Sequence, residues 1–360
     1  MVINDDADLG AAVRQFEVGG EFRGAEPFGK GLIHRSYCVT VDRGGDAQRF
    51  ILQRVNTRVF PQPANLMENI DRVTAHLAGL ASETGRRAAT LVRAVDGRSW
   101  HVDTEGAWWR MYRYLEGTRT VEQIESTAQC FEVARAFGDF QLQLTTLPPP
   151  RLHDTIPGFH DTPRRIAVLE QAIAADVAGR MKLAGPEIDF VMARRPLARV
   201  LLDAGMPERV THNDTKINNV LLDEKTGEAV CVIDLDTVMP GLAVYDFGDM
   251  VRTTTSPAKE DEKDLSKVKM QFPMFEALAR GYLSAAGEFL TPAEKKFLPF
   301  AGKLITFEIG IRFLTDFLAG DVYFKVHREG QNLDRCRTQF KLVESIEQQE
   351  IEMNKLVEAI

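Results

Sequence analysis

Three polar side chains between residues 212 and 241 have the types and the spacing that magnesium-dependent phosphoryl transfer requires. Asp214 lies in a short polar stretch, Asn219 follows five residues later, and Asp234 ends a four-residue apolar run. Transfer from a nucleotide needs one carboxylate to orient the attacking hydroxyl, and an amide and a second carboxylate to hold magnesium against the phosphates. Because kinase catalytic loops use this order and spacing, we expect Asp214 to be the catalytic base and Asn219 and Asp234 the metal ligands.

Two further charged residues lie within or just after this set. Lys216 follows Asp214 by two residues, as in many serine/threonine protein kinases, where the lysine offsets negative charge on the transferred phosphoryl group. A solvent-exposed lysine without a catalytic role is the alternative, because most lysines are exposed. Asp236 is a candidate contact of the second metal or of the substrate, and an ordinary loop hydrogen bond fits the sequence equally well.

The tripeptide Asp246-Phe247-Gly248 spells the metal-binding motif of protein kinases, but its position argues against that role. It lies thirty-two residues after Asp214, whereas Asp234 lies twenty residues after it. The spacing of Asp234 fits the metal ligand better. We therefore interpret Asp246 as a structural or helix-capping acid.

A glycine-rich segment near the N-terminus is the candidate phosphate loop. Gly29, Lys30 and Gly31 precede a β-prone stretch, and glycine amides can approach a phosphate closely. The lysine expected on a following strand is absent, because Gln53 stands where a cation would contact the α- and β-phosphates, and Arg54 points to the other face by strand alternation. Lys30, or Gln53 as a neutral donor, is the candidate replacement.

Periodicity divides the chain into a β-rich N-terminal part and a mainly helical remainder. We expect an α+β, bilobed, protein-kinase-like fold with lobes at 1–115 and 116–360. The nucleotide cleft is expected near residues 112–117, with Tyr114 and Glu116 among the contacts. Strands are predicted at 32–41, 49–55, 89–94, 98–102, 107–115, 219–223 and 229–234. Helices are predicted at 65–80, 122–146, 163–183, 186–204, 272–287, 292–319 and 334–360.

The polar stretch 253–267 is predicted to be a loop, either a mobile lid or an ordinary solvated segment. Arg312 lies in a strongly apolar helix, and a buried guanidinium needs a partner or a cleft. Asp316, four residues later, is one candidate partner. The other interpretation is that Arg312 grips hydroxyl or carbonyl oxygens of a substrate, with Tyr323 nearby to stack on a ligand or to fill the core.

Composition narrows the classes of protein. A net charge of −8 argues against nucleic-acid binding, which needs a concentrated basic face. The four cysteines are far apart and form no C-x-x-C pair, so a reducing compartment is expected. The sequence has no signal-peptide pattern and no run of 18 apolar residues, so we expect a cytoplasmic protein without membrane spans. It does not specify an oligomeric state.

With these residues in place, the chain resembles the aminoglycoside phosphotransferase and choline kinase superfamily. The signature H-x-D-x-x-x-x-N is matched by His212, Asp214 and Asn219. Within that superfamily the chain is similar to the bacterial N-acetylhexosamine 1-kinases, from about residue 9 to the last helix. The shared phrases are Phe-Gly-Asp-Phe-Gln (137–141), Phe-His-Asp-Thr-Pro (159–163), Val-Thr-His-Asn-Asp-Thr-Lys (210–216), Ile-Asp-Leu-Asp-Thr (233–237), Met-Pro-Gly (239–241), Asp-Glu-Lys-Asp-Leu-Ser-Lys-Val (261–268) and Arg-Phe-Leu (312–314).

This resemblance implies ATP-dependent phosphorylation of the anomeric hydroxyl of N-acetylglucosamine and N-acetylgalactosamine, with Mg²⁺ as cofactor. By matching positions it also implies that Arg312 and Tyr323 contact the sugar. The family shares Ile-Leu-Gln in the strand that carries Gln53, so the missing lysine is a family trait. The family pattern Gly-His-Ile-Asn is replaced here by Gly-Leu-Ile-His, which makes His34 a candidate sugar contact, and Thr253 replaces an aromatic residue.

Two other classes of function remain open from the sequence. One is a kinase of another small alcohol or sugar, such as choline, homoserine or an aminoglycoside. The other is a non-catalytic nucleotide-binding protein, which is disfavoured because such proteins usually lose a member of the Asp/Asn/Asp set. The expected partners are a nucleotide and a small sugar.

Overall fold

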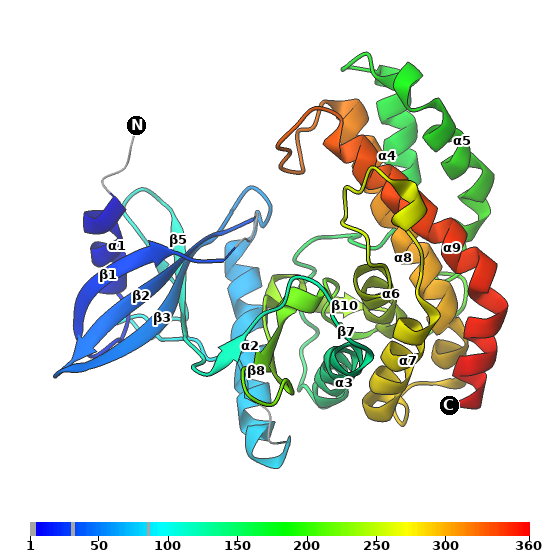
Figure 1. Cartoon of the computed structure of the whole chain (residues 1–360). Coiled ribbons are helices and arrows are strands. Elements are labelled where there is room, and N and C mark those ends of the chain that lie inside the picture. Colours follow the sequence, from blue (N-terminus) through cyan, green and yellow to red (C-terminus); the bar gives the residue numbers. More distant parts are fainter. Residues whose placement is uncertain (1–4, 30–32, 85–86) are drawn as a thin grey trace. The chain divides into compact units, whose positions relative to one another are not determined.

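The computed structural model describes residues 5–29, 33–84 and 87–360, and it confirms the predicted fold class. An antiparallel sheet forms the N-terminal region and helices dominate the C-terminal region (Figure 1). The chain divides into two compact units, which we describe separately. The first comprises Met1–Thr118, Leu147–Ile156 and Cys231–Val238, and the second comprises Arg119–Thr146, Pro157–Val230 and Met239–Ile360.

The sheet of the first unit has the strand order β1-β2-β3-β5-β4 and is antiparallel throughout. Its strands are β1 (Glu21–Pro27), β2 (Arg35–Arg43), β3 (Asp46–Arg54), β4 (His101–Val102) and β5 (Trp108–Arg113). Strand β1 was not predicted, because it contains Gly24 and Pro27. In the structure its pairing register with β2 shifts between Phe22 and Gly24. Gly29, with φ of 76°, follows β1, so the glycine-rich segment lies between two paired strands.

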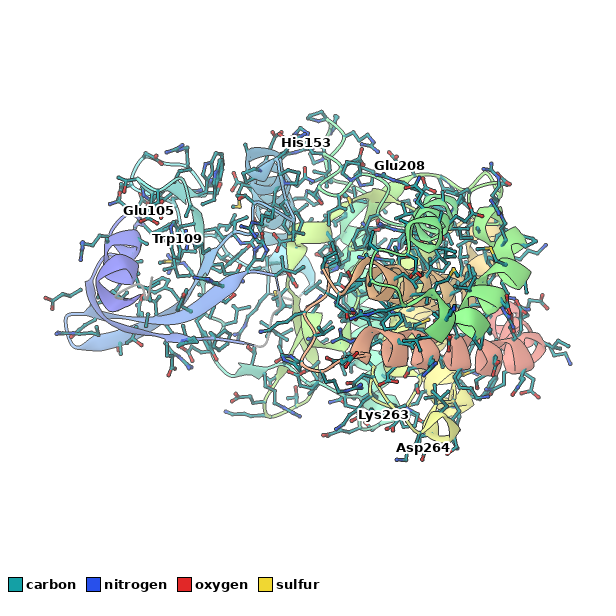
Figure 2. The ribbon with its side chains drawn as sticks, turned by 90° about the horizontal axis from the view of Figure 1, so that it is seen from above. Glu105, Trp109, His153, Glu208, Lys263 and Asp264 are labelled. Carbon is teal, nitrogen blue, oxygen red and sulfur yellow. The ribbon has the colours of Figure 1, made fainter. Side chains whose placement is uncertain are left out.

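Alternating side chains of the strands pack against one helix to form the core of this unit. Val39 and Val41 of β2, Phe50 of β3 and Met111 of β5 are buried together with residues of α1 (Asp5–Val13). Each such side chain contributes roughly 1.5–3 kcal/mol when it leaves water. At the edge, Trp109 (Figure 2) donates its indole N–H to Asp103 at 2.8 Å, which closes the turn before β5.

Helix α2 (Pro63–Thr84) joins the later segments of the chain to the first unit. Asn69, which is fully buried, donates to the carbonyl oxygens of His153 (2.8 Å) and Val238 (3.2 Å) and accepts the N–H of His153 (2.9 Å). His153 (Figure 2) also lies 3.0 Å from Glu68 on the same helix. The segments 147–156 and 231–238 are therefore fixed to α2 by hydrogen bonds between the Asn69 side chain and their backbone groups.

The second unit is built from long helices, and α8 packs along α9 (Figure 1). The helices are α3 (Thr127–Leu144), α4 (Thr162–Ala175), α5 (Gly185–Arg194), α6 (Ala243–Thr254), α7 (Phe272–Ala286), α8 (Pro292–Ala319) and α9 (Gln331–Ala359). Strands β7 (Arg209–Thr211) and β10 (Met239–Gly241) pair antiparallel. Strands β6 (Thr118–Arg119), β8 (Val220–Asp223) and β9 (Ala229–Val232) form a small sheet in the order β6-β8-β9. No helix of the described ranges is long and apolar enough to cross a bilayer.

Several predicted elements are shorter than the periodicity suggested. The helix expected at 163–183 ends at Ala175, where Asp176 adopts a left-handed conformation, and the one expected at 186–204 stops at Arg194 before Pro196. The strands expected at 89–94 and 98–102 are reduced to isolated bridges and to β4. Helix α6 was missed, and it includes the first two residues of the stretch predicted as a loop at 253–267.

Candidate active site

A buried carboxylate of α6 shapes the loop that carries Asp214. Asp246 accepts the backbone N–H groups of His212 (2.9 Å) and Asn213 (2.7 Å), and its carbonyl oxygen accepts the Thr215 hydroxyl (2.6 Å). Gln141 of α3 donates to the same carboxylate at 2.6 Å. Asp246 thus acts as a structural acid, as interpreted from its spacing. It does not cap α6, whose N-cap residue is Leu242.

The structure brings Asp214, Lys216 and Asn219 together on this loop. The Lys216 ammonium lies 2.8 Å from Asp214, and the Asn219 amide donates to the backbone carbonyl (2.8 Å) and the carboxylate (3.3 Å) of Asp214. The Asp214 side chain is 24% exposed and that of Lys216 is 43% exposed, so the pair is accessible to a ligand. Burial raises the pKa of Asp214, but Lys216 outweighs it and holds that pKa below its usual value. Asp214 is therefore a carboxylate at neutral pH, able to accept a hydroxyl proton in a hydrogen bond.

The oxygen donors predicted for magnesium fit that ion chemically. Because the Nδ2 of Asn219 is engaged with Asp214, its Oδ1 is the atom left to face a cation. Asp234 has left-handed backbone angles (φ 61°, ψ 58°) at the start of the short helix η4 (Leu235–Thr237). No cluster of three His, Cys, Asp or Glu occurs within the described part of the chain. Asn219 belongs to the second unit and Asp234 to the first. Mg²⁺ commonly takes few protein oxygens and completes its shell with phosphate and water, so oxygen donors of these types suit it.

In the first unit, Arg110 links several predicted residues in one buried network. Its guanidinium donates to both carboxylate oxygens of Asp236 at 2.6 Å and to Gln53 at 2.8 Å. His34 lies 3.4 Å from Asp236, and Gln53 donates to the Ser36 hydroxyl at 3.0 Å. Arg110 is opposite Gln53 in the β3–β5 register, so it supplies a cation beside the position that lacks the lysine.

Arg110 was not found from the sequence, although a signal for it exists. It lies in the run Trp-Trp-Arg-Met-Tyr and is 1% exposed. A guanidinium in a buried strand needs a carboxylate partner, and Asp236, considered from the sequence as a metal or substrate contact or as part of an ordinary loop hydrogen bond, was available. Burial raises the pKa of Asp236, but Arg110 and His34 outweigh it and hold that pKa well below its usual value. Asp236 is therefore ionised and bound on both oxygens.

The remaining predicted nucleotide contacts fall into two groups. Gly29 has a positive φ, and a Cβ added there would meet no atom within 4 Å, so its backbone is open to a ligand. Lys30 and Gly31, like Leu32, lie outside the described residues. Tyr114 and Glu116 both contact Arg49, whose guanidinium lies 3.9 Å from the Tyr114 ring centroid and donates to both Glu116 oxygens.

Arg312 is surrounded by aromatic rings. Its guanidinium carbon lies 5.1 Å from the Phe159 centroid, 5.6 Å from that of Phe324 and 5.9 Å from that of Tyr323. Asp316, the partner considered from the sequence, instead accepts the backbone N–H groups of residues 322, 323 and 324 at 2.8–2.9 Å. No contact between Arg312 and Asp316 forms in the described structure, so that interpretation is wrong.

A second arginine, Arg165 of α4, lies beside this group. It donates to the carbonyl oxygen of Phe159 at 2.7 Å, and its buried Nε has no hydrogen-bond partner in the described structure. Burial and the nearby charge of Arg312 lower the pKa of Arg165. Phe159 precedes His160, whose ring lies 3.2 Å from the carbonyl oxygen of Asn213. The two arginines are therefore adjacent to the loop of Asp214 and have donors that a ligand can use.

Arg252, near the end of α6, contacts the segment that follows this helix. Arg252 pairs with Asp249 at 2.7 Å and lies 3.7 Å from Glu260. Thr253, which replaces an aromatic residue of the resembled family, donates to the Asp249 carbonyl oxygen at 2.9 Å. The segment continues through Lys263 and Asp264 (Figure 2), and Asp264 caps the short helix η5 (Leu265–Lys267).

Comparison with known proteins places these features in a family. Residues 24–292 match the model of the phosphotransferase enzyme family, and the chain belongs to that family. Solved structures with the same fold include a microcompartment-associated aminopropanol kinase (18% identity, TM-score 0.60, covering 97% of this chain and 98% of that one). An aminoglycoside phosphotransferase from Alicyclobacillus acidocaldarius is 12% identical, with a TM-score of 0.64 and coverage of 97% and 96%. A spectinomycin phosphotransferase bound to ADP and spectinomycin is 13% identical, with a TM-score of 0.57 and coverage of 99% of both chains.

Proposed function

We propose that this protein is an ATP- and Mg²⁺-dependent kinase that phosphorylates a hydroxyl group of a small molecule. The carrying observation is the loop in which Lys216 and Asn219 both lie within hydrogen-bonding reach of Asp214, in a chain of the phosphotransferase family. ATP as donor is supported by similar structures that bind ADP or ATP. These structures share little sequence identity with the chain, so they establish only the common fold. ATP as the phosphoryl donor is therefore part of the proposal.

The residues of the loop have distinct roles in this reaction. The Asp214 carboxylate accepts a hydrogen bond from the acceptor hydroxyl and aligns its oxygen for in-line attack on the γ-phosphate. Lys216 offsets charge that develops on the transferred group. Asn219 and Asp234 would hold the magnesium ion, which neutralises phosphate charge when it is bound. Transfer is direct, without a covalent enzyme intermediate.

We propose an N-acetylhexosamine as acceptor, phosphorylated at its anomeric hydroxyl. The sequence phrases shared with the N-acetylhexosamine 1-kinases support this, and so do the residues around Arg312. Arg165 and Arg312 offer N–H donors to hydroxyl and acetamido oxygens, and Tyr323, 58% exposed, offers an aromatic face to a sugar ring. His34 remains a candidate sugar contact in the first unit, whereas Asp236 is buried and bound on both oxygens by Arg110.

The same arginines disfavour the amine acceptors named for similar structures, such as aminopropanol and choline. A cationic amine beside Arg312 would meet a like charge, which costs roughly 3–4 kcal/mol at 4–6 Å in a partly solvated site. Each nearby carboxylate is already bonded: Glu308 to His160 and Thr162, and Asp316 to the backbone. An amine would find no spare carboxylate among them.

Release of ADP across a panel of acceptors tests the proposal. The panel contains N-acetylglucosamine, N-acetylgalactosamine, glucose, choline, homoserine and an aminoglycoside, and ³¹P and ¹³C NMR locate the phosphate on the product. We expect turnover of N-acetylhexosamines with phosphate on the anomeric oxygen. Phosphate on the 6-hydroxyl, or turnover of amines alone, would refute the 1-kinase assignment. Nucleotide binding without turnover of any acceptor would instead indicate a non-catalytic protein.

A further inference from the structure

His160 and Glu308 form a buried pair next to the loop of Asp214. The Nδ1 of His160 lies 2.8 Å from one carboxylate oxygen of Glu308, and the Thr162 hydroxyl donates to the other oxygen at 2.6 Å. The His160 and Glu308 side chains are 3% and 0% exposed. The pair therefore connects the segment before α4 to the middle of α8, away from solvent.

The second ring nitrogen of His160 faces the loop itself. Its Nε2 lies 3.2 Å from the backbone carbonyl oxygen of Asn213. A carbonyl oxygen and an ionised carboxylate can only accept hydrogen bonds, whereas a neutral imidazole has a single N–H. Two hydrogen bonds from this ring therefore require a proton on each nitrogen, that is, an imidazolium.

Glu308 is the ionised partner that this arrangement needs. Burial raises the pKa of Glu308, but His160 and Thr162, together with Arg165, outweigh it and hold that pKa below its usual value. Tyr245 of α6, whose ring centroid lies 5.0 Å from that of His160, has its pKa raised by burial and by the charges of Glu308 and Asp161, so it stays neutral.

The carbonyl group held by His160 belongs to the peptide that carries Asp214. Asn213 has φ of 65°, a left-handed conformation that requires support from its surroundings. Asp246 accepts the N–H of Asn213 at 2.7 Å, and His212 Nδ1 accepts the N–H of Asp214 at 3.3 Å. His160 thus supplies a contact on the carbonyl side of the peptide that carries Asp214.

We propose that His160, held as an imidazolium by Glu308, positions the catalytic carboxylate of Asp214 through the backbone carbonyl of Asn213. The role of Asp214 rests on the proposed function, whereas the doubly protonated ring does not. His160 touches no reacting group, so it is a positioning residue.

The charged groups around this ring come from four elements. Glu308 faces it from α8, Arg165 and Asp161 lie on and before α4, and Asp246 of α6 holds the adjacent N–H of Asn213. Because Glu308 is in direct contact with the ring, removal of its charge is the decisive perturbation.

NMR of the ¹⁵N-labelled protein tests the protonation state without any substrate. The wild-type protein is expected to show one histidine with both ring nitrogens protonated at pH 7, and its signals should disappear in His160→Gln. In Glu308→Gln the same ring should carry a single proton. A wild-type His160 with one protonated nitrogen at pH 7 would overturn the proposal.

Kinetics test the positioning role. His160→Phe should lower kcat by about 10- to 10²-fold, because a small misplacement of a catalytic group has effects of that size, while KM for the nucleotide is retained. His160→Gln keeps an N–H donor for the Asn213 carbonyl, so it should recover part of the rate. His153→Gln, at an exposed histidine paired with Glu68, is the matched control.

The outcomes separate this proposal from the proposed function. An unchanged kcat in both His160→Gln and Glu308→Gln would overturn the positioning role. If His160→Phe fails to fold, the two polar variants still decide whether His160 has a positioning role. If the wild-type protein turns over no acceptor at all, the proposed function fails, and with it the positioning of a catalytic group. The NMR result then still decides whether the ring is doubly protonated.

Discussion

Arg110 and Asp236, 126 positions apart in the chain, form a bidentate ion pair with both N–O distances at 2.6 Å and side chains 1% and 4% exposed. The pair joins strand β5 to the segment 231–238, which contains Asp234. Because the guanidinium bonds both oxygens, the orientation of Asp236 is fixed. The position of this segment within the first unit therefore depends on Arg110.

Removal of one member of this pair should destabilise the protein strongly. In Arg110→Met the Asp236 carboxylate stays buried without its partner, which typically costs about 3–5 kcal/mol of unfolding free energy. The double variant Arg110→Met/Asp236→Leu should recover much of that loss, since an apolar pair replaces the ion pair. Urea unfolding measures both. Arg23→Met, which removes an exposed ion pair with Asp42, is the control and should leave the midpoint nearly unchanged. Equal midpoints for Arg110→Met and Arg23→Met would contradict the prediction.

Asp214→Asn should abolish most of the turnover while leaving nucleotide binding intact. The amide keeps the size of the side chain but cannot accept the hydroxyl proton, and general-base and positioning effects are typically worth at least about 10²-fold in kcat. Calorimetric titration with ADP and Mg²⁺ should give a Kd close to that of the wild-type protein. Asp203→Asn, at an exposed carboxylate paired with Arg199, provides the matched control. Near-normal turnover by Asp214→Asn would remove Asp214 from its assigned role.

Two glycines in helices should respond to alanine in opposite directions. A Cβ on Gly281 of α7 would lie 2.3 Å from the carbonyl oxygen of Phe131 in α3, whereas a Cβ on Gly79 of α2 would meet nothing within 4 Å. Gly281→Ala forces two backbones apart, which we expect to cost about 1–3 kcal/mol or more. Gly79→Ala should stabilise the protein by about 0.5–1 kcal/mol through helix propensity alone. Thermal unfolding of both variants checks the sign, and destabilisation of equal size would refute the close α3–α7 contact.

The elements that could be predicted from the sequence are those with a strong local pattern. Helices α8 and α9 and the β2–β3 hairpin show apolar periodicity over many residues, and the prediction found them. Helix α6 was missed because it buries Asp246, Asp249 and Arg252. These charges interrupt the apolar periodicity that indicates a helix, and their partners are distant in the sequence or buried in the fold.

The same distinction holds for the candidate site. Asp214, Lys216 and Asn219 lie within six residues of one another, so their spacing alone brought them together in the prediction. The partners of Arg110 and of His160 are 126 and 148 positions away, and no local pattern specifies such pairs. The interpretation that Arg312 pairs with Asp316 was wrong for a related reason. Helical spacing made the pair possible, but the Asp316 carboxylate accepts backbone N–H groups of the loop after α8 instead.

Glu294 should make the stability of the protein depend on acid pH. Its carboxylate caps α8 with Thr291 and forms a bidentate pair with Arg209 at 2.6 and 2.9 Å. Burial raises the pKa of Glu294, but Arg209 and Thr291 outweigh it and lower the pKa below its usual value. A carboxyl group with a lowered folded-state pKa stabilises the protein above its unfolded pKa, near 4.3 for glutamate, and loses that contribution as the pH falls through the folded value.

Glu294→Gln keeps the capping geometry but removes the charge, so it should lower the free energy of unfolding by about 1–3 kcal/mol at pH 7. The difference from the wild-type protein should shrink below about pH 4, because the wild-type carboxylate then becomes protonated as well. Urea unfolding of both proteins between pH 3 and 7 measures the difference. A gap that stays constant over this range would show that the Glu294 charge contributes nothing to stability, and that the pair with Arg209 acts only through its geometry.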